Sequence, residues 1–163
     1  RSMTAEEIGQ FIHEKEAIYR ELFVNNPLDF APGARDFIRF LNDSGIGVAI
    51  ATASGCENVD FYLSFLHLGD LIKPEHVIYN NGRLKSKPDP EIFNLALSTL
   101  GLKGLETVIF EDSHAGIRAA ENAGAGKVII VNSAQNDYSA YPHTVITDFS
   151  EVDPQLFKSS IHD

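Results

Sequence analysis

Two adjacent carboxylates, Glu111 and Asp112, directly follow the apolar residues 108–110, and a helical pattern begins straight after them. Apolar triplets of this kind are typical of buried parallel strands, so we expect the acids at a strand's carboxyl end, where open α/β sheets bind ligands. Adjacent carboxylates repel each other, and a hard cation between them relieves the repulsion. A solvated turn is the alternative. The pattern predicts a metal site at this pair.

A second candidate site lies at Thr52, which ends the apolar run 46–52, and at Ser54 just after it, before a helical pattern that starts near Glu57. Small hydroxylated residues and a glycine at a strand-to-helix turn can offer O–H and backbone N–H donors to an anion. An ordinary Ser/Thr helix cap fits the same residues. Anion binding at this turn is therefore a hypothesis.

Lys87 is the third candidate, because it lies in a segment that two prolines make stiff. Pro88 restricts the residue before it to extended backbone, and Pro90 fits the first position of the helix that follows. Asp89 can cap that helix. Most lysines are mobile surface charges, whereas the backbone around Lys87 is constrained. The segment thus predicts a cation held in one place.

Predicted strands and helices, the elements that must position these residues, alternate along the chain from Pro32 onwards. Apolar runs at 46–52, 77–79, 108–110 and 127–131 are separated by helical patterns. This alternation predicts an α/β fold with a doubly wound parallel sheet. Right-handed crossovers would bring the carboxyl ends of the strands to one edge. A hydroxyl donor, a fixed lysine and an acid pair would meet there, a combination that suits phosphoryl transfer.

The N-terminal residues 4–25 are expected to form one long helix. Thr4 and Glu7 match a capping box, and apolar residues follow at helical spacing. The composition changes between Asn25 and Pro32, which indicates a hinge between a helical piece and an α/β piece. We therefore expect two parts, a helical piece at 1–31 and an α/β domain at 32–163.

Composition narrows the class of protein further. The 163 residues are 44% apolar, with a formal net charge of −10 and a single cysteine. Such a chain can form one domain with a sizeable core, and its acidity argues against nucleic-acid binding. The six histidines lack zinc-ligand spacing. No signal peptide or membrane-length apolar run is visible, so we expect a soluble cytoplasmic protein with a local phosphate site.

The order and spacing of these motifs resemble the haloacid dehalogenase-like hydrolases, in particular the subgroup of sugar-phosphate phosphatases and β-phosphoglucomutase. The resembling stretches are residues 31–33, 50–54, 87–93 and 109–116, and the likeness extends over most of the chain. The resemblance implies a Rossmann-like core and a helical cap that closes over the site. Residues 4–25 look like the last helix of that cap.

The resemblance also implies a role for each candidate residue. The hydroxyl of Thr52 would bind the transferring phosphoryl group, and Lys87 would neutralise the nucleophile and the phosphate. The backbone at Ala53 and the hydroxyl of Ser54 would help to hold the substrate. The acid pair would hold Mg²⁺, with Asp112 as the direct ligand.

One family element has no counterpart in this sequence. Members of the family begin with an apolar strand that ends in Asp-x-Asp-Gly, whose first aspartate attacks phosphorus. Here Asp29, Asp36 and Asp89 lack a preceding strand. In the family this strand lies between the strands that match those ending at Thr52 and at Glu111. We therefore expect the later part of a longer protein, or a second chain that supplies the strand, and no activity from this chain alone.

The expected function is that of a Mg²⁺-dependent phosphohydrolase of small phosphorylated metabolites, working through an aspartyl-phosphate whose aspartate lies outside this chain. A β-phosphoglucomutase-like phosphomutase is the nearest alternative. A dehalogenase has no use for a metal-holding acid pair. A non-catalytic binding or regulatory fragment is the alternative from another class; receiver domains, however, place their acid pair early in the chain, and here it comes late.

Overall fold

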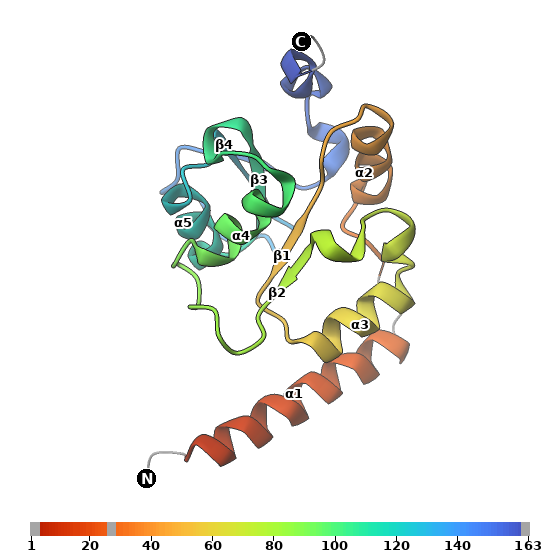
Figure 1. Ribbon diagram of the computed structural model, residues 1–163, viewed down its shortest axis with the longest axis vertical. Helices are drawn as coiled ribbons and strands as arrows, with labels where there is room; N and C mark the ends of the chain where they lie inside the picture. The colour runs from red at the N-terminus through yellow and green to blue at the C-terminus, as the bar shows by residue number, and fades with distance from the viewer. Residues whose placement is uncertain (1–3, 26–28, 161–163) are drawn as a thin grey trace.

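The structure is a computed structural model that describes residues 4–25 and 29–160. Its helices are α1 (Ala5–Asn25), α2 (Ala34–Asp43), α3 (Cys56–Phe65), α4 (Glu91–Leu100) and α5 (His114–Asn122), shown in Figure 1. Its strands are β1 (Ile50–Thr52), β2 (Val77–Tyr79), β3 (Val108–Glu111), β4 (Lys127–Val131) and β5 (Thr144–Ile146). Short 3₁₀ helices η1 (Leu68–Asp70), η2 (Pro74–His76), η3 (Gly104–Glu106), η4 (Phe149–Glu151) and η5 (Pro154–Ser160) complete the described elements.

All the strand pairs in the described residues are parallel, and they form two sheets. In one sheet β1 pairs with β2, and in the other the order is β3-β4-β5. Parallel strands need crossover connections. Helix α5 supplies the one between β3 and β4 and α3 lies in the one between β1 and β2, whereas residues 132–143 connect β4 with β5 without a helix. The α/β fold expected from the alternating patterns is therefore confirmed.

Helices cover both faces of the larger sheet. Successive side chains along its strands point to opposite faces, so each face needs an apolar cover. Ile109, Val128 and Ile130 face α4 and α5 in one apolar cluster. Ile129 and Val131 belong to a second cluster, with residues of α2 and of the η4–η5 region. Strands buried on both faces are nearly continuous in apolar residues, which is why these runs were recognisable in the sequence.

Strand β1 is shorter than the apolar run that predicted it. Only residues 50–52 form a ladder, although the run covers 46–52. The partner strand β2 is itself three residues long, and Ile50 already pairs with its first residue, Val77. The preceding apolar residues still pack into the core, Val48 among them. Hydrophobicity thus predicted contact with the core, but it overestimated both the length of the strand and its burial, because the residues of β1 are only half-buried.

The two sheets are joined through side chains. Ile92 and Phe93 of α4 lie in one apolar cluster with Ile109 of β3, and Ala51 of β1 and Ile78 of β2 pack against the same cluster. Within the part of the chain that the structure describes, no ladder connects β1 with β3. Helix α4 therefore bridges the two sheets where backbone pairing does not (Figure 1).

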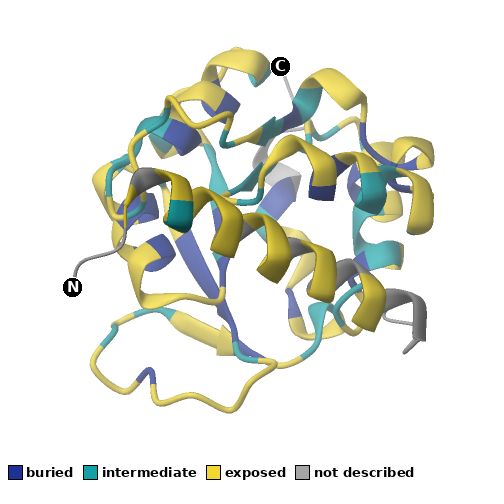
Figure 2. Cartoon of the chain, turned by 90° about the horizontal axis from the view of Figure 1, so that it is seen from below, coloured by how far each residue is buried: buried dark blue, intermediate teal, exposed yellow. Residues whose placement is uncertain are grey.

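Helix α1 forms as predicted, and it lies beside α3 (Figure 1). Its capping box is present, because the Thr4 amide donates to Glu7 Oε2 at 2.7 Å and the Glu7 amide donates to Thr4 Oγ1 at 3.2 Å. Figure 2 shows much of α1 as exposed. The division into 1–31 and 32–163 stays a prediction, and residues 26–28 of the expected hinge lie outside the described residues.

None of the helices in residues 4–25 and 29–160 combines the length and the apolar character needed to cross a membrane.

Gly33, which precedes α2, is expected to be sensitive to substitution. Its φ is +72°, and an added Cβ would overlap the Asp148 carboxylate and lie 2.9 Å from the Ser150 backbone nitrogen. The Ser150 amide donates to Asp148 at 2.8 Å, which lowers the pKa of Asp148 and fixes this turn. Gly33→Ala should therefore lower the free energy of unfolding by about 2–3 kcal/mol in urea denaturation.

Gly45→Ala is the matched control. Gly45 also has a φ of +72°, but nothing lies within 4 Å of the position that a Cβ would take there. This variant should show the cost of the left-handed backbone alone, about 1 kcal/mol. Equal losses for the two variants would contradict the close approach of Gly33 to the 148–150 turn.

Candidate active site

Lys87 and Glu111 form a buried ion pair that links the two sheets. Lys87 lies on the loop after β2, whose Lys87–Pro88 peptide bond is cis, and its ammonium donates to Oε1 of Glu111 at the end of β3. The two side chains are 15% and 7% exposed. The ammonium also lies 4.7 Å from the centre of the Phe93 ring. Asn122 of α5 donates to the Pro88 carbonyl at 3.0 Å, which ties down the loop. The lysine is therefore held from several sides.

The second carboxylate oxygen of Glu111 is held by the turn that follows. The Ser113 hydroxyl donates to Oε2 at 3.1 Å, and the Asp112 amide does so at 3.2 Å. Ser113 also caps α5, since its hydroxyl accepts from the Gly116 amide at 3.0 Å. Sequence reasoning missed Ser113 as part of the site. A serine before a helix is so common a cap that its second contact leaves no separate signal.

Gly116 lies against the same carboxylate. It is buried in the first turn of α5, and a Cβ at this position would overlap the carboxyl group of Glu111. Glycine disfavours helices by about 1 kcal/mol relative to alanine, so its presence there indicates a close approach. Sequence reasoning did not single out this residue, although that unfavourable propensity was a usable signal.

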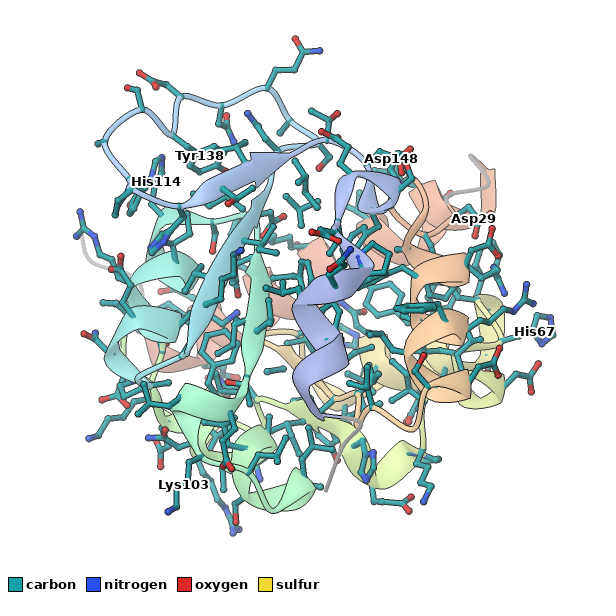
Figure 3. All side chains as sticks on the ribbon, turned by 90° about the horizontal axis from the view of Figure 1, so that it is seen from above. Asp29, His67, Lys103, His114, Tyr138 and Asp148 are labelled. Atoms are coloured by element: carbon teal, nitrogen blue, oxygen red, sulfur yellow. The ribbon has the colours of Figure 1, made fainter. Side chains whose placement is uncertain are left out.

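The two neighbouring acids have different surroundings. Asp112 is exposed, and its carboxylate makes no hydrogen bond or ion pair with any residue in 4–25 or 29–157 for which side chains are described. Its backbone carbonyl accepts a hydrogen bond from the hydroxyl of Tyr138, labelled in Figure 3. Glu111 faces inward to Lys87, whereas the carboxylate of Asp112 remains available to a ligand.

Thr52, Ala53 and Ser54 form the turn between β1 and α3. The Ser54 amide donates to the Thr52 hydroxyl at 3.1 Å, which closes the turn. Ala53 is exposed, and Thr52 and Ser54 are half-buried. No hydrogen bond connects this turn with Lys87 or Glu111 among the described residues. The structure thus brings Lys87 and Glu111 into contact and leaves the Thr52 turn as a separate group of donors.

Metal binding would rest on few side chains. No group of three or more His, Cys, Asp or Glu side chains in the described part of the chain is arranged to hold a metal ion. Asp112 offers free carboxylate oxygens, the donor type that Mg²⁺ prefers, and Mg²⁺ is commonly held by one or two carboxylates with water and substrate phosphate. The residues present therefore fit a partial Mg²⁺ site.

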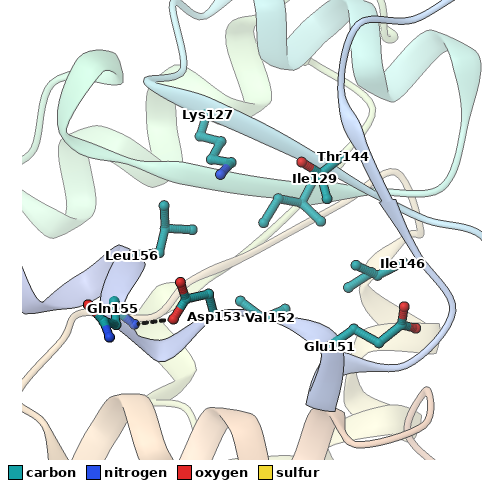
Figure 4. Close-up of a pocket in the computed structure, with 9 residues that line it drawn as sticks. All are labelled: Lys127, Ile129, Thr144, Ile146, Glu151, Val152, Asp153, Gln155 and Leu156. Atoms are coloured by element: carbon teal, nitrogen blue, oxygen red, sulfur yellow. Dashed lines mark hydrogen bonds between the residues drawn. The ribbon is translucent and has the colours of Figure 1, made fainter.

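A cavity of about 350 Å³ lies elsewhere, over β4 and β5 and beside the η4–η5 region (Figure 4). None of the six residues predicted from the sequence lines it. Its polar lining residues include Lys127, Thr144 and Glu151, and Lys127 and Thr144 begin their strands. The candidate site lies instead at the carboxyl ends of the strands, as expected for ligands of α/β sheets.

Comparison with known sequences supports the resemblance. The family model of the haloacid dehalogenase-like hydrolases matches residues 2–124. The phosphorylated carbohydrates phosphatase of Thermotoga maritima is 34% identical over 128 residues, which are 78% of this chain and 56% of that protein. Protein CbbY of Rhodobacter capsulatus is 30% identical over 128 residues, 75% of this chain and 55% of that protein. The chain spans about half the length of these curated relatives.

Comparison with solved structures agrees. A hydrolase of Entamoeba histolytica, of the family IA, variant 3 type, has a TM-score of 0.90 and 26% identity, covering 100% of this chain and 74% of that chain. The putative β-phosphoglucomutase of Thermotoga maritima has a TM-score of 0.68 and 28% identity, covering 89% and 66%. Because the family model covers most of the sequence and these folds superpose on it, the chain belongs to the haloacid dehalogenase-like hydrolases.

Proposed function

We propose that this chain forms the phosphate- and metal-binding part of a Mg²⁺-dependent phosphatase of small phosphorylated carbohydrates. The observation that carries the proposal is the buried Lys87–Glu111 pair next to the open carboxylate of Asp112 at the end of β3. The substrate class comes from the Thermotoga maritima phosphatase, which is 34% identical. Phosphoryl transfer depends chiefly on positioning and charge neutralisation, and this arrangement offers both.

Lys87 would hold the phosphoryl oxygens. An ammonium group has three N–H donors, and Glu111 accepts from it, which leaves donors for a phosphate. Glu111 and the ring of Phe93 fix the position of the ammonium group, so little order has to be created when substrate binds. Lys87 would neutralise charge that develops on the phosphoryl group.

The Thr52 turn would supply neutral donors. The hydroxyl oxygen of Thr52 accepts from the Ser54 amide, so its own O–H proton can be donated to a phosphoryl oxygen. The backbone at Ala53 and the Ser54 hydroxyl would bind neighbouring oxygens of the substrate. Asp112, with Glu111 beside it, would hold Mg²⁺. When bound, the ion would add charge stabilisation at the phosphoryl oxygens.

The nucleophile is proposed to be an aspartate outside this chain, on a strand that pairs between β1 and β3. Two observations support this arrangement. In the described residues β1 and β3 share no ladder, although both pack on α4. The chain also spans only about half the length of its curated relatives. Intact mass of the natural protein should therefore exceed 17.9 kDa or reveal a second polypeptide. A single species of 17.9 kDa with phosphatase activity would contradict the proposal.

Asp112→Asn tests the metal role. In protein that carries the nucleophile, this change should lower kcat/KM for p-nitrophenyl phosphate in Mg²⁺ by about 100-fold or more, because it weakens the metal ligand without changing its size. Asp43→Asn, at the exposed end of α2, is the control, and its kcat/KM should equal that of the wild type. Undiminished activity of Asp112→Asn, or activity that survives EDTA, would refute the metal role.

A phosphomutase is the second candidate, favoured by the likeness to the putative β-phosphoglucomutase of Thermotoga maritima. The two reactions differ in whether water or a sugar hydroxyl accepts the phosphoryl group. Incubation with β-glucose 1-phosphate distinguishes them, because a mutase forms a sugar phosphate isomer and a phosphatase releases inorganic phosphate. A protein that does neither, with or without Mg²⁺, would be a non-catalytic member of the family.

A further inference from the structure

The segment 132–143, between β4 and β5, reaches back to the candidate metal site. Tyr138 is 5% exposed, and its hydroxyl donates to the backbone carbonyl of Asp112, 26 residues earlier in the chain. The turn before Tyr138 is closed by Asn132, whose side chain accepts from the Asn136 amide at 2.9 Å and donates to the Asn136 carbonyl at 3.0 Å. Tyr138 therefore contacts Asp112 from a braced turn.

The same segment also packs on His114, two positions after Asp112. The ring of Tyr138 lies 5.2 Å from the ring of His114, and both residues are labelled close together in Figure 3. The hydroxyl of Tyr141 lies 3.0 Å from Nδ1 of His114, and the two rings are stacked at 5.5 Å. Tyr138 thus contacts Asp112 itself, whereas Tyr141 contacts His114, the first residue of α5.

We propose that Tyr138 is a positioning residue for Asp112. A hydrogen bond to the Asp112 carbonyl restricts rotation about the bond between its Cα and its carbonyl carbon, and so fixes the loop between β3 and α5. On the inner side, Glu111 is held by Lys87 and Ser113. Tyr138 braces the outer side, so the Cα–Cβ bond that carries the free carboxylate keeps one direction. This inference rests on the proposed role of Asp112 as a metal ligand.

Tyr138→Phe is the direct test, since it removes the hydroxyl and keeps the ring. Binding of Mn²⁺, used as a paramagnetic substitute for Mg²⁺, is titrated by electron paramagnetic resonance on purified protein that carries the nucleophile. We expect the Kd for Mn²⁺ to rise about 10-fold, as found when residues that orient metal ligands are changed. The circular dichroism spectrum should stay unchanged. Mn²⁺ binding equal to that of the wild type would overturn the inference.

Tyr141→Phe is the matched control. It removes a hydroxyl from the same segment, but one that contacts His114 instead of Asp112. Its Mn²⁺ affinity should equal that of the wild type. An equal weakening in both variants would point to general loosening of the segment and would also overturn the specific role of Tyr138.

Two further variants keep the test decisive. If Asp112→Asn binds Mn²⁺ like the wild type, the metal role itself is wrong; if it loses binding and Tyr138→Phe does not, only the positioning role is wrong. Should Tyr138→Phe fail to fold, Asn132→Ala replaces it, because it releases the 132–136 turn and leaves the tyrosine intact. Weaker Mn²⁺ binding by Asn132→Ala is then expected, and unchanged binding would contradict the inference.

Discussion

Lys87→Met is expected to lower the free energy of unfolding by about 3 kcal/mol. The substitution leaves the Glu111 carboxylate buried, 7% exposed, without its counter-charge, and breaking one side of a buried ion pair typically costs about 3–5 kcal/mol. The donors from Ser113 and from the Asp112 amide still solvate the carboxylate, which places the expected loss at the lower end. Urea denaturation at neutral pH measures the difference.

Two companion variants show whether the pair is responsible. Lys87→Met combined with Glu111→Gln should recover part of the loss, because the uncompensated charge is gone. Lys85→Met removes a lysine from the same loop whose side chain is 74% exposed and lies 3.4 Å from Asp89. That exposed pair should contribute at most about 1 kcal/mol. Equal losses for the Lys85 and Lys87 variants would contradict a buried pair.

Gly116→Ala is the second large effect, and its sign is opposite to what helix propensity predicts. Alanine favours a helix over glycine by about 1 kcal/mol, but its Cβ would overlap the Glu111 carboxylate here. That carboxylate cannot move without losing contacts to Lys87 and Ser113. We expect a net loss of about 2–3 kcal/mol in the free energy of unfolding, as for other overpacked sites.

Gly9→Ala is the control for this prediction. Gly9 lies in α1, and nothing occupies the space within 4 Å of its Cβ position. This variant should follow propensity and increase helicity measured by circular dichroism. If Gly116→Ala stabilises the protein as well, then Gly116 does not lie against the carboxylate. Gly116→Ala should also lower phosphatase activity in protein that carries the nucleophile. The displaced Glu111 carboxylate would no longer hold Lys87 in place.

Local patterns in the sequence predicted much of this fold. The span of α1 and its Thr4–Glu7 capping box follow from neighbouring residues, and β2 and β4 occur where their short apolar runs lie. The acid pair is at the end of β3, as the run before it indicated. These features were predictable because helix caps and buried strands depend on residues within a few positions of one another.

The sequence by itself determined the α/β class and the family, and it named six candidate site residues, whose roles stay predictions. Only the tertiary structure decided how Glu111 and Asp112 differ, because that depends on Lys87 and Tyr138, which lie 24 and 26 residues from their partners. The close approach of Gly116 to Glu111 likewise requires helix α5 to pack against the end of β3. Adjacent carboxylates look equivalent in a sequence, and distant donors then turn one inward to a lysine and leave the other open to a cation.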